Sequence, residues 1–192
     1  MALIVGGTTV TGTQTLEAST LTGTASAING SNITNLTSGL TVADQWRVTT
    51  DFDGSVQPVI NNWEQSDGTA QGNLGSSMAN SSGVWTFPST GFYYINFNCT
   101  ARHDTDVRYL YCIIDATTNN SSYVDIAYGW GHIEPQSGDT YVSPTAQTIV
   151  DVTDTSNVKV RFGTNTGVGG THWNCGSSQN LFTATFIRLG DT

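Results

Sequence analysis

Histidine, carboxylate and aromatic side chains gather in a few segments of the sequence that lack strand-like alternation. Imidazole changes charge near neutral pH, and aromatic faces mixed with polar groups suit sugars and mixed protein surfaces. We therefore predict a receptor-binding set. Its members are His103, Asp104, Asp106, His132, Glu134, Tyr141, His172 and Trp173.

Patterns that would indicate catalysis are absent from the sequence. It contains no Gly-x-Ser-x-Gly elbow, no phosphate-binding P-loop and no His-Glu-x-x-His zinc motif. We therefore predict that the protein is not an enzyme and assign no catalytic residue.

Closely spaced carboxylates raise the question of a bound cation. Asp104 and Asp106, like the acids of Asp51-Phe52-Asp53-Gly54 and the pair Asp151 and Asp154, offer oxygen ligands at short spacing, as calcium loops do. None of these segments matches the full twelve-residue calcium loop, and capping of turns explains them equally well. We expect no cofactor, with Asp104 and Asp106 as the candidates for Ca²⁺ if a cation binds.

The cysteines do not form a recognisable metal or redox motif. Cys99 and Cys112 lie in apolar, strand-like segments, and Cys175 stands apart without Cys-x-x-Cys spacing. Buried free thiols are the favoured interpretation, and a bond between Cys99 and Cys112 stays open if their strands are adjacent.

The elements that must position these residues are β-strands. Alternating or doubly apolar segments predict about eight strands, bounded by Gly, Pro, Asn and Ser, and no segment has a helical period with caps. The predicted strands are 40–50, 84–87, 92–101, 108–115, 123–130, 143–152, 158–164 and 181–189. The fold class is therefore an all-β antiparallel sandwich, with jelly-roll topology favoured.

Connections in an antiparallel sandwich alternate between its two ends. The connections 88–91, 117–122 and 153–157 are short, whereas 51–83, 131–142 and 163–180 are longer and share one end with 102–107. All the receptor-binding candidates fall on that second end, where long loops on a rigid scaffold usually bind ligands.

Charge and composition exclude several classes of function. The 192 residues carry 6 basic and 15 acidic side chains, a formal net charge of -9. So few cations cannot neutralise a phosphate backbone, so we predict no nucleic-acid binding. No apolar run approaches a membrane span, and the N-terminus lacks the basic region of a signal peptide, so we predict no membrane insertion.

Composition changes near residue 40 and predicts two domains, 1–40 and 41–192. Residues 1–40 contain no aromatic residue and one acid, Glu17, with aliphatic residues every five to seven positions. We interpret them as an extended β stalk or docking arm that shares a core between chains, rather than as a disordered leader.

Several segments resemble known families. Residues 83–97 (GVWTFPSTGFYYINF) resemble the most recognisable segment of the C1q/TNF-like jelly roll. Residues 150–162 fit the hairpin before its last strand and 182–189 resemble that strand, with Ala184 where glycine is usual. Residues 21–36 resemble the repetitive stalks of bacteriophage fibres, notably those of marine phages. The resemblance implies a phage appendage protein whose C1q-like head forms a homotrimer.

Surplus apolar surface supports that assembly. Residues 108–115 are apolar on both faces, with further tyrosines nearby, which exceeds what one sandwich interior needs. We predict trimer contacts through Tyr93, Tyr94, Tyr109 and Tyr111.

The predicted function is a structural virion appendage, a homotrimeric tail or head fibre assembled in the host cytoplasm. Residues 1–40 would bind other virion proteins of tail or capsid, and the head a host cell-surface glycan or protein. The alternatives are a capsid decoration or cement protein without a receptor role, or a secreted C1q-like lectin. A polysaccharide-degrading tailspike needs a longer chain and a close acid pair.

Overall fold

The computed structural model describes residues 3–5, 8–10 and 39–192 of the chain. The chain divides into two compact units, Met1–Leu36 and Thr37–Thr192. In the first unit, β1 (Leu3–Val5) pairs with β2 (Thr8–Val10) as an antiparallel two-stranded sheet. The predicted stalk over residues 1–40 otherwise lies almost entirely outside the described residues. The second unit is called the head below.

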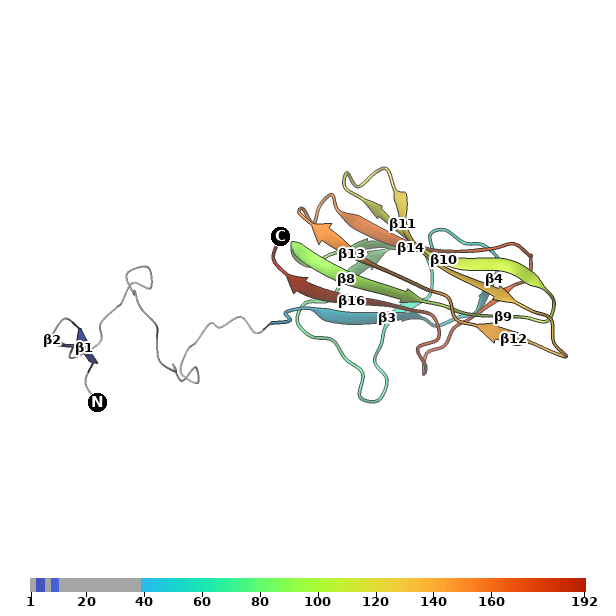
Figure 1. The fold of residues 1–192 in the computed structure, drawn as a ribbon, viewed down its shortest axis with the longest axis horizontal. Coiled ribbons are helices and arrows are strands. Elements are labelled where there is room, and N and C mark those ends of the chain that lie inside the picture. The colour runs from blue at the N-terminus through green and yellow to red at the C-terminus, as the bar shows by residue number, and fades with distance from the viewer. Residues whose placement is uncertain (1–2, 6–7, 11–38) are drawn as a thin grey trace. The chain divides into compact units, whose positions relative to one another are not determined.

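Every regular element described in the head is a β-strand, which confirms the predicted all-β class (Figure 1). The strands are β3 (Ala43–Val48), β4 (Phe52–Asp53), β5 (Trp63–Gln65), β6 (Ala79–Ser81), β7 (Val84–Thr86), β8 (Gly91–Asn98), β9 (Thr100–His103), β10 (Val107–Thr117), β11 (Val124–Ile133), β12 (Thr140–Val142), β13 (Thr145–Val152), β14 (Lys159–Thr166), β15 (His172–Asn174) and β16 (Thr183–Gly190). Among the described residues, no helix is long and apolar enough to cross a membrane.

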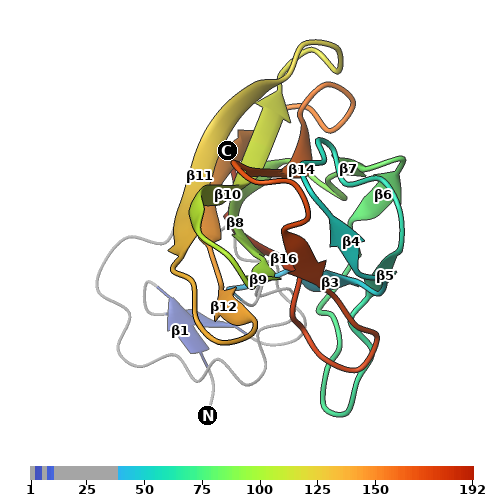
Figure 2. The same ribbon diagram turned by 90° about the vertical axis from the view of Figure 1, so that its right-hand side faces the viewer.

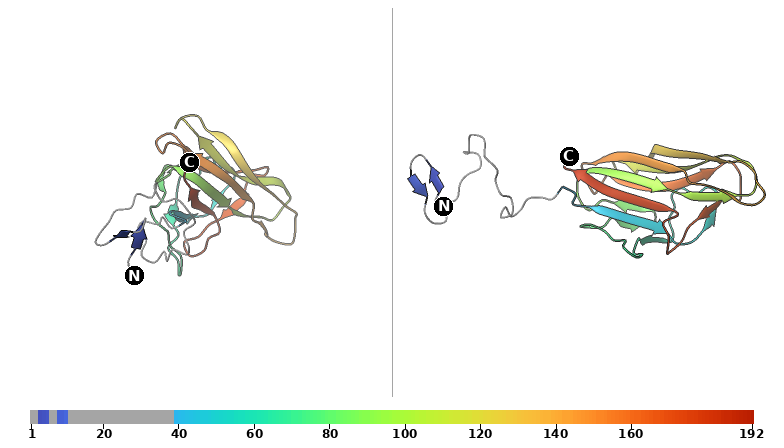
Figure 3. Two further views of the ribbon diagram at one scale, coloured as in Figure 1. Left: turned by 60° about the vertical axis from the view of Figure 1, so that its left-hand side comes forward. Right: turned by 60° about the horizontal axis from the view of Figure 1, so that its bottom comes forward.

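Two five-stranded antiparallel sheets form the predicted sandwich. One has the strand order β11-β10-β14-β7-β6 and the other β13-β8-β16-β3-β5. Figure 3 (right) shows β13, β8, β16 and β3 lying side by side. Apart from the consecutive pairs β10-β11 and β6-β7, the neighbours in both sheets are non-consecutive strands, so long-range pairings hold the head together.

Period-two alternation in β8 explains why this strand has one inner and one outer face. Tyr93, Ile95 and Phe97 are fully buried, whereas Phe92 is exposed and Tyr94 is half-buried. Successive side chains of a strand point to opposite faces, so each apolar residue at the odd positions enters the core.

Aromatic rings fill the space between the sheets. Trp85 of β7 is fully buried, and the ring centroids of Trp46, Trp63, Phe162 and Phe186 lie 5.1 to 5.9 Å from its own. Such pairs add to the stabilisation from burying the rings themselves, mostly at edge-to-face or tilted angles. The core therefore joins β3, β5, β7, β14 and β16 in one contact network.

Gly129 allows the edges of the two sheets to approach on one side of the sandwich. A Cβ atom at this position of β11 would lie 2.3 Å from the backbone carbonyl of Thr145 in β13. Any side chain here would push β11 and β13 apart, so glycine is needed for the close approach.

A smaller antiparallel sheet closes one end of the sandwich. Its order is β12-β9-β15-β4, and it lies opposite the end that holds the C-terminus and the start of β3 (Figures 1 and 2). Within the chain, β9 follows β8 after Cys99 alone. The position of the small sheet is therefore set by the end of β8 in the sandwich.

The segment 51–83, expected to be irregular, contains three short strands. β4, β5 and β6 span two or three residues each. Alternation over so few residues gives no recognisable period. β4 also pairs with the distant β15, whereas β6 pairs with the next strand, β7. Likewise β12 and β15 lie within segments that the sequence analysis treated as loops.

Tyr93 is misassigned as a trimer contact. Its side chain is fully buried inside the head, its hydroxyl lies 3.1 Å from the carbonyl oxygen of Ser89, and its ring packs 4.7 Å from Phe87. The inward phase of β8 places it in the core, so it offers no atom to another chain.

The three cysteines are free and buried. Burial raises the pKa of the Cys99 thiol well above its usual value, and that of Cys175 to about 12. Cys99 and Cys175 therefore remain protonated near neutral pH and serve as small apolar core residues.

Replacing an aromatic ring at the centre of the core by a smaller side chain should destabilise the head measurably. We expect Phe162→Leu to lower the free energy of unfolding by about 1–2 kcal/mol, because contacts with Trp63, Trp85 and Phe97 are lost. Chemical denaturation followed by tryptophan fluorescence measures this. The matched change Ile149→Leu, at a site 59% exposed, should stay within about 0.5 kcal/mol; equal losses in the two variants would contradict the assigned core.

Candidate functional site

The register of the small sheet aligns four polar or aromatic residues in one row across its strands. Tyr141 of β12 lies opposite Arg102 of β9, Arg102 opposite His172 of β15, and His172 opposite Asp53 of β4. Residues opposite each other in antiparallel strands share a face. These four residues, called the polar row below, therefore project on the same side of the sheet.

The neighbouring row projects toward the core. It consists of Val142, Ala101, Trp173 and Phe52, which are buried or packed against the core. The alternation of strand residues thus gives the small sheet an apolar inner face and a polar outer face.

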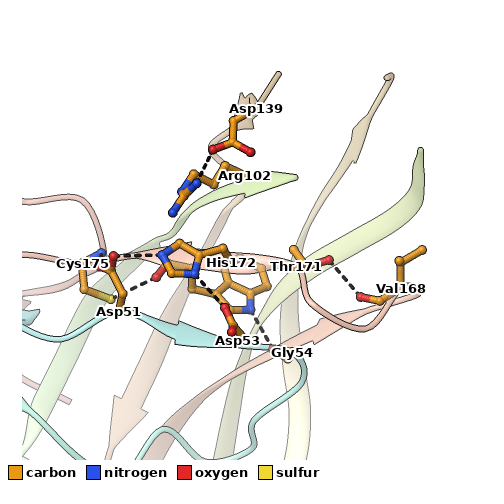
Figure 4. A network of polar contacts seen from close by, with 10 residues as sticks. Asp51, Asp53, Gly54, Arg102, Asp139, Val168, Thr171, His172 and Cys175 are labelled. Carbon is orange, nitrogen blue, oxygen red and sulfur yellow. Dashed lines mark hydrogen bonds and ion pairs between the residues drawn. The ribbon is translucent and has the colours of Figure 1, made fainter. Parts of the chain in front are cut away.

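His172 is held between two carboxylates (Figure 4). Its Nδ1 atom lies 2.7 Å from Asp53 Oδ1 and its Nε2 atom 2.9 Å from Asp51 Oδ2. Ionised carboxylates only accept, so both ring nitrogens must donate, which requires the protonated imidazolium. Asp51 is fixed in turn, because its Oδ1 accepts from the backbone N–H of Cys175 at 2.6 Å.

These contacts set the ionisation of both groups. Burial lowers the pKa of His172, but the hydrogen bonds to Asp51 and Asp53 outweigh it and the pKa lies above its usual 6.5. Burial likewise raises the pKa of Asp51, but hydrogen bonds from Cys175 and His172 bring it below its usual 3.8. The pair is therefore charged over the mildly acidic range.

Arg102 pairs with Asp139 beside the polar row. The guanidinium donates from Nη1 to Asp139 Oδ2, and this hydrogen bond raises the pKa of Arg102 further. Asp139 precedes β12, so the pair connects β9 to the loop after β11. Arg102 keeps its Nη2 nitrogen for another acceptor, since no hydrogen bond within the described residues uses it.

An open polar hollow lies beside the row. Besides members of the row and Asp139, it is lined by His103, Asp104 and Gly170. His103 Nδ1 accepts from the backbone N–H of Thr105 at 3.0 Å and lies 3.5 Å from Asp104 Oδ1. The hollow therefore presents donors, acceptors and an imidazole ring to solvent.

The predicted receptor-binding residues divide into two groups. His103, Asp104 and His172 line the hollow, and Tyr141, 60% exposed, lies beside it in the polar row. The other exposed candidates, Asp106, His132 and Glu134, do not line it.

Trp173 is wrongly predicted as a binding residue. It is fully buried, stacks on Phe52, packs edge-on against Phe182, and donates from Nε1 to Gly54 O at 2.7 Å. Successive side chains of a strand point to opposite faces of the sheet. Because His172 points to the outer face, the side chain at position 173 points into the core.

The sequence analysis missed two sets of contacts at this site. Arg102 and Asp139 carry no motif, and only the pairing of β9 with β12 brings them together. Asp51 and Asp53 were noticed as a possible cation pair, and their actual partner is His172, 119 residues away from Asp53.

No group of three or more His, Cys, Asp or Glu side chains in the described part of the chain is arranged to hold a metal ion. Asp104 and Asp106 as Ca²⁺ ligands stay a prediction. Asp154, by contrast, caps a turn, accepting from Ser156 N–H at 2.7 Å and Asn157 Nδ2 at 2.6 Å.

The fold of the head has counterparts among solved TNF-type jelly rolls. The chain is similar to Eiger TNF from S. frugiperda (12% identity, 81% of this chain and 96% of that chain, TM-score 0.57) and to murine APRIL at pH 5.0 (8% identity, 77% and 98%, TM-score 0.56). These likenesses confirm the predicted jelly-roll fold and show the fold alone. No family model matches the sequence, and no curated protein matches it.

Replacing His172 should change how stability depends on pH. The folded-state pKa of His172 is raised, so its contribution is complete below about pH 6.5 and is lost as pH rises through the folded value. The contribution of Asp51 is present above about pH 3.8 and is lost as pH falls through its lowered value. We expect His172→Asn to cost about 1–2 kcal/mol at pH 5.5 and less at pH 9.

Thermal and urea unfolding across that pH range would measure the effect. The matched variant His132→Asn changes an exposed histidine on β11 and should leave the profile unchanged. A loss for His172→Asn that is the same at both pH values would contradict the protonated pairing.

Proposed function

We propose that the protein is a non-enzymatic virion appendage of a bacteriophage, in which three heads assemble and bind a component of the host surface. An exposed aromatic surface on β10 and β11 is the observation that carries this proposal. The TNF-like fold, the phage-fibre resemblance of residues 21–36 and the acidic net charge support it.

The aromatic surface consists of Tyr109, Tyr111, Tyr128 and Trp130. Ring centroids of Trp130 and Tyr111 lie 4.2 Å apart, and those of Tyr111 and Tyr128 5.5 Å. Yet Tyr109, Tyr128 and Trp130 are 41%, 44% and 62% exposed. A cluster of this kind buries more surface when a partner covers it, and Trp and Tyr are enriched where binding energy concentrates.

The position of this surface favours another copy of the same chain as its partner. β11 is the edge strand of its sheet, so no further strand of the same chain borders the cluster on that side. Every copy carries the same surface, so a rotationally symmetric ring can cover all of them. Two of the predicted trimer residues, Tyr109 and Tyr111, belong to this cluster. Of the other two predicted residues, Tyr93 is buried in the core, and Tyr94 lies on the other sheet, where its hydroxyl donates to Gln147 Oε1 at 2.7 Å.

The polar hollow is placed to meet a ligand. Its lining residues include members of β4, β9 and β15 of the small sheet, which closes one end of the sandwich. In the proposed appendage, residues 1–40 dock onto tail or capsid and the small sheet contacts the host. Three heads per fibre and many fibres per particle would strengthen a weak individual contact.

A charge on the aromatic surface should disrupt assembly. Trp130→Glu buries an unpaired carboxylate in the proposed contact, so we expect at least about 30-fold weaker association. Static light scattering should give three times the 20.4 kDa chain mass for the wild type and a lower mass for the variant.

The matched control is Ile60→Glu, which introduces the same charge at a site 49% exposed. Ile60 lies next to Gly83, before β7, far from the β11 edge of the sheet. It should leave the mass unchanged. A wild-type mass of a single chain at micromolar concentration would refute the trimer.

Removing residues 1–36 should leave the head folded but prevent its incorporation into virions. The head is a compact unit of its own from Thr37 onward, so the truncated chain should stay folded and assembled. Circular dichroism and light scattering check this. It should be missing from purified virions assembled with it in place of the full chain, as judged by immunoblot. Normal incorporation would refute the docking role of the N-terminal segment.

A further inference from the structure

The outer face of the small sheet has the groups that recognise a sugar. We propose that the polar row, Tyr141-Arg102-His172-Asp53, together with the adjoining hollow, binds a neutral saccharide of the host surface. This inference rests on the proposed function and names the ligand class of the binding end.

The spacing of the row provides the first argument. Adjacent strands lie about 4.8 Å apart, so one side chain after another is offered at that interval. The row therefore presents a phenol ring, a guanidinium, an imidazolium and a carboxylate in sequence. A saccharide alternates hydroxyl groups, each a donor and an acceptor, around a ring with apolar C–H faces. Such a ligand can use the phenol ring, the guanidinium and the carboxylate, while His172, whose two ring nitrogens are engaged by Asp51 and Asp53, holds Asp53 in place.

Tyr141 supplies the apolar part of the site. Its side chain is 60% exposed although its strand neighbour Val142 packs against the core. It is the large aromatic residue of the row, directly opposite Arg102. A flat ring held on a strand can stack on a sugar face, and it loses little conformational freedom on binding.

The polar groups are already fixed before a ligand arrives. Asp51 and Asp53 hold His172 from both sides, and Asp139 holds Arg102. Because each carboxylate has two oxygens, Asp53 and Asp139 each keep one that accepts no hydrogen bond from the described residues. Preorganised groups of this kind lower the cost of ordering a ligand.

Charge selects a neutral ligand. Around the row and hollow, the carboxylates of Asp51, Asp53, Asp104 and Asp139 face the cationic groups of Arg102 and His172. The local excess is negative, as it is for the whole chain, so sialylated or sulfated glycans would be repelled.

Gly170 keeps the hollow open. Its φ is +83°, and a Cβ atom there would meet only His103 Nε2, at 3.9 Å. Asparagine tolerates this conformation, so Gly170→Asn can fill the space without removing any group of the row.

The decisive experiment measures binding of the full-length assembled protein to host cells. Cells are treated with periodate, which cleaves vicinal diols of sugars, or with protease. We expect periodate to abolish binding and protease to leave it intact. Tyr141→Ala and Gly170→Asn should each weaken binding at least tenfold, with light scattering and thermal unfolding unchanged. The matched control is Phe92→Ala, an exposed aromatic residue at the start of β8, away from the small sheet, and it should bind normally.

A second measurement uses an array of neutral, sialylated and sulfated oligosaccharides with hexalysine as a cationic probe. Binding to neutral oligosaccharides that Tyr141→Ala removes supports the inference, even if the wild type binds no host cell and the receptor role itself fails. Cell binding that both variants retain, or that protease abolishes, overturns the inference while the receptor role stands. Binding to sulfated oligosaccharides or hexalysine alone overturns it as well.

Discussion

The burial of Trp173 fixes the geometry on which the polar row depends. Its ring is enclosed by Phe52 and Phe182 and its Nε1 donates to Gly54 O. A strand of three residues has no register of its own, so this anchored ring sets the phase of β15. With Trp173 inward, His172 must face outward, between Asp53 of the neighbouring strand β4 and Asp51, which precedes that strand. A shift by one residue would exchange the core anchor and the polar group.

The sequence reveals the long strands because their alternation extends over many residues. In β8, eight residues alternate between inner and outer positions, and the eleven residues of β10 include a run that is apolar on both faces, so the sequence shows both strands clearly. The sequence also predicted two of the four residues of the aromatic surface. Tyr109 and Tyr111 stood out in a doubly apolar segment, but Tyr128 and Trp130 joined them only through the pairing of β10 with β11.

The sequence locates the candidate site at one end of the sandwich but does not reveal how its residues come together. Alternating connections place His103, Tyr141 and His172 at one end, yet Arg102 and Asp139 have no local signal, and Asp53 looked like a turn residue. Their partners lie 37 and 119 residues away. The errors at Trp173 and Tyr93 share one cause, since both residue types suit a binding surface and a core equally. Only the phase of the strand decides between the two environments.

The head keeps its two surfaces chemically distinct. The aromatic surface lies on the outer face of β10 and β11, whereas the polar row lies on β12, β9, β15 and β4 at the end of the sandwich. The aromatic rings on β10 and β11 pack on one another without charged partners, while the polar row keeps its charged groups paired. Covering the first surface leaves the second open. The proposed function requires this separation, because a single surface serving both assembly and host binding would be covered once the heads assemble.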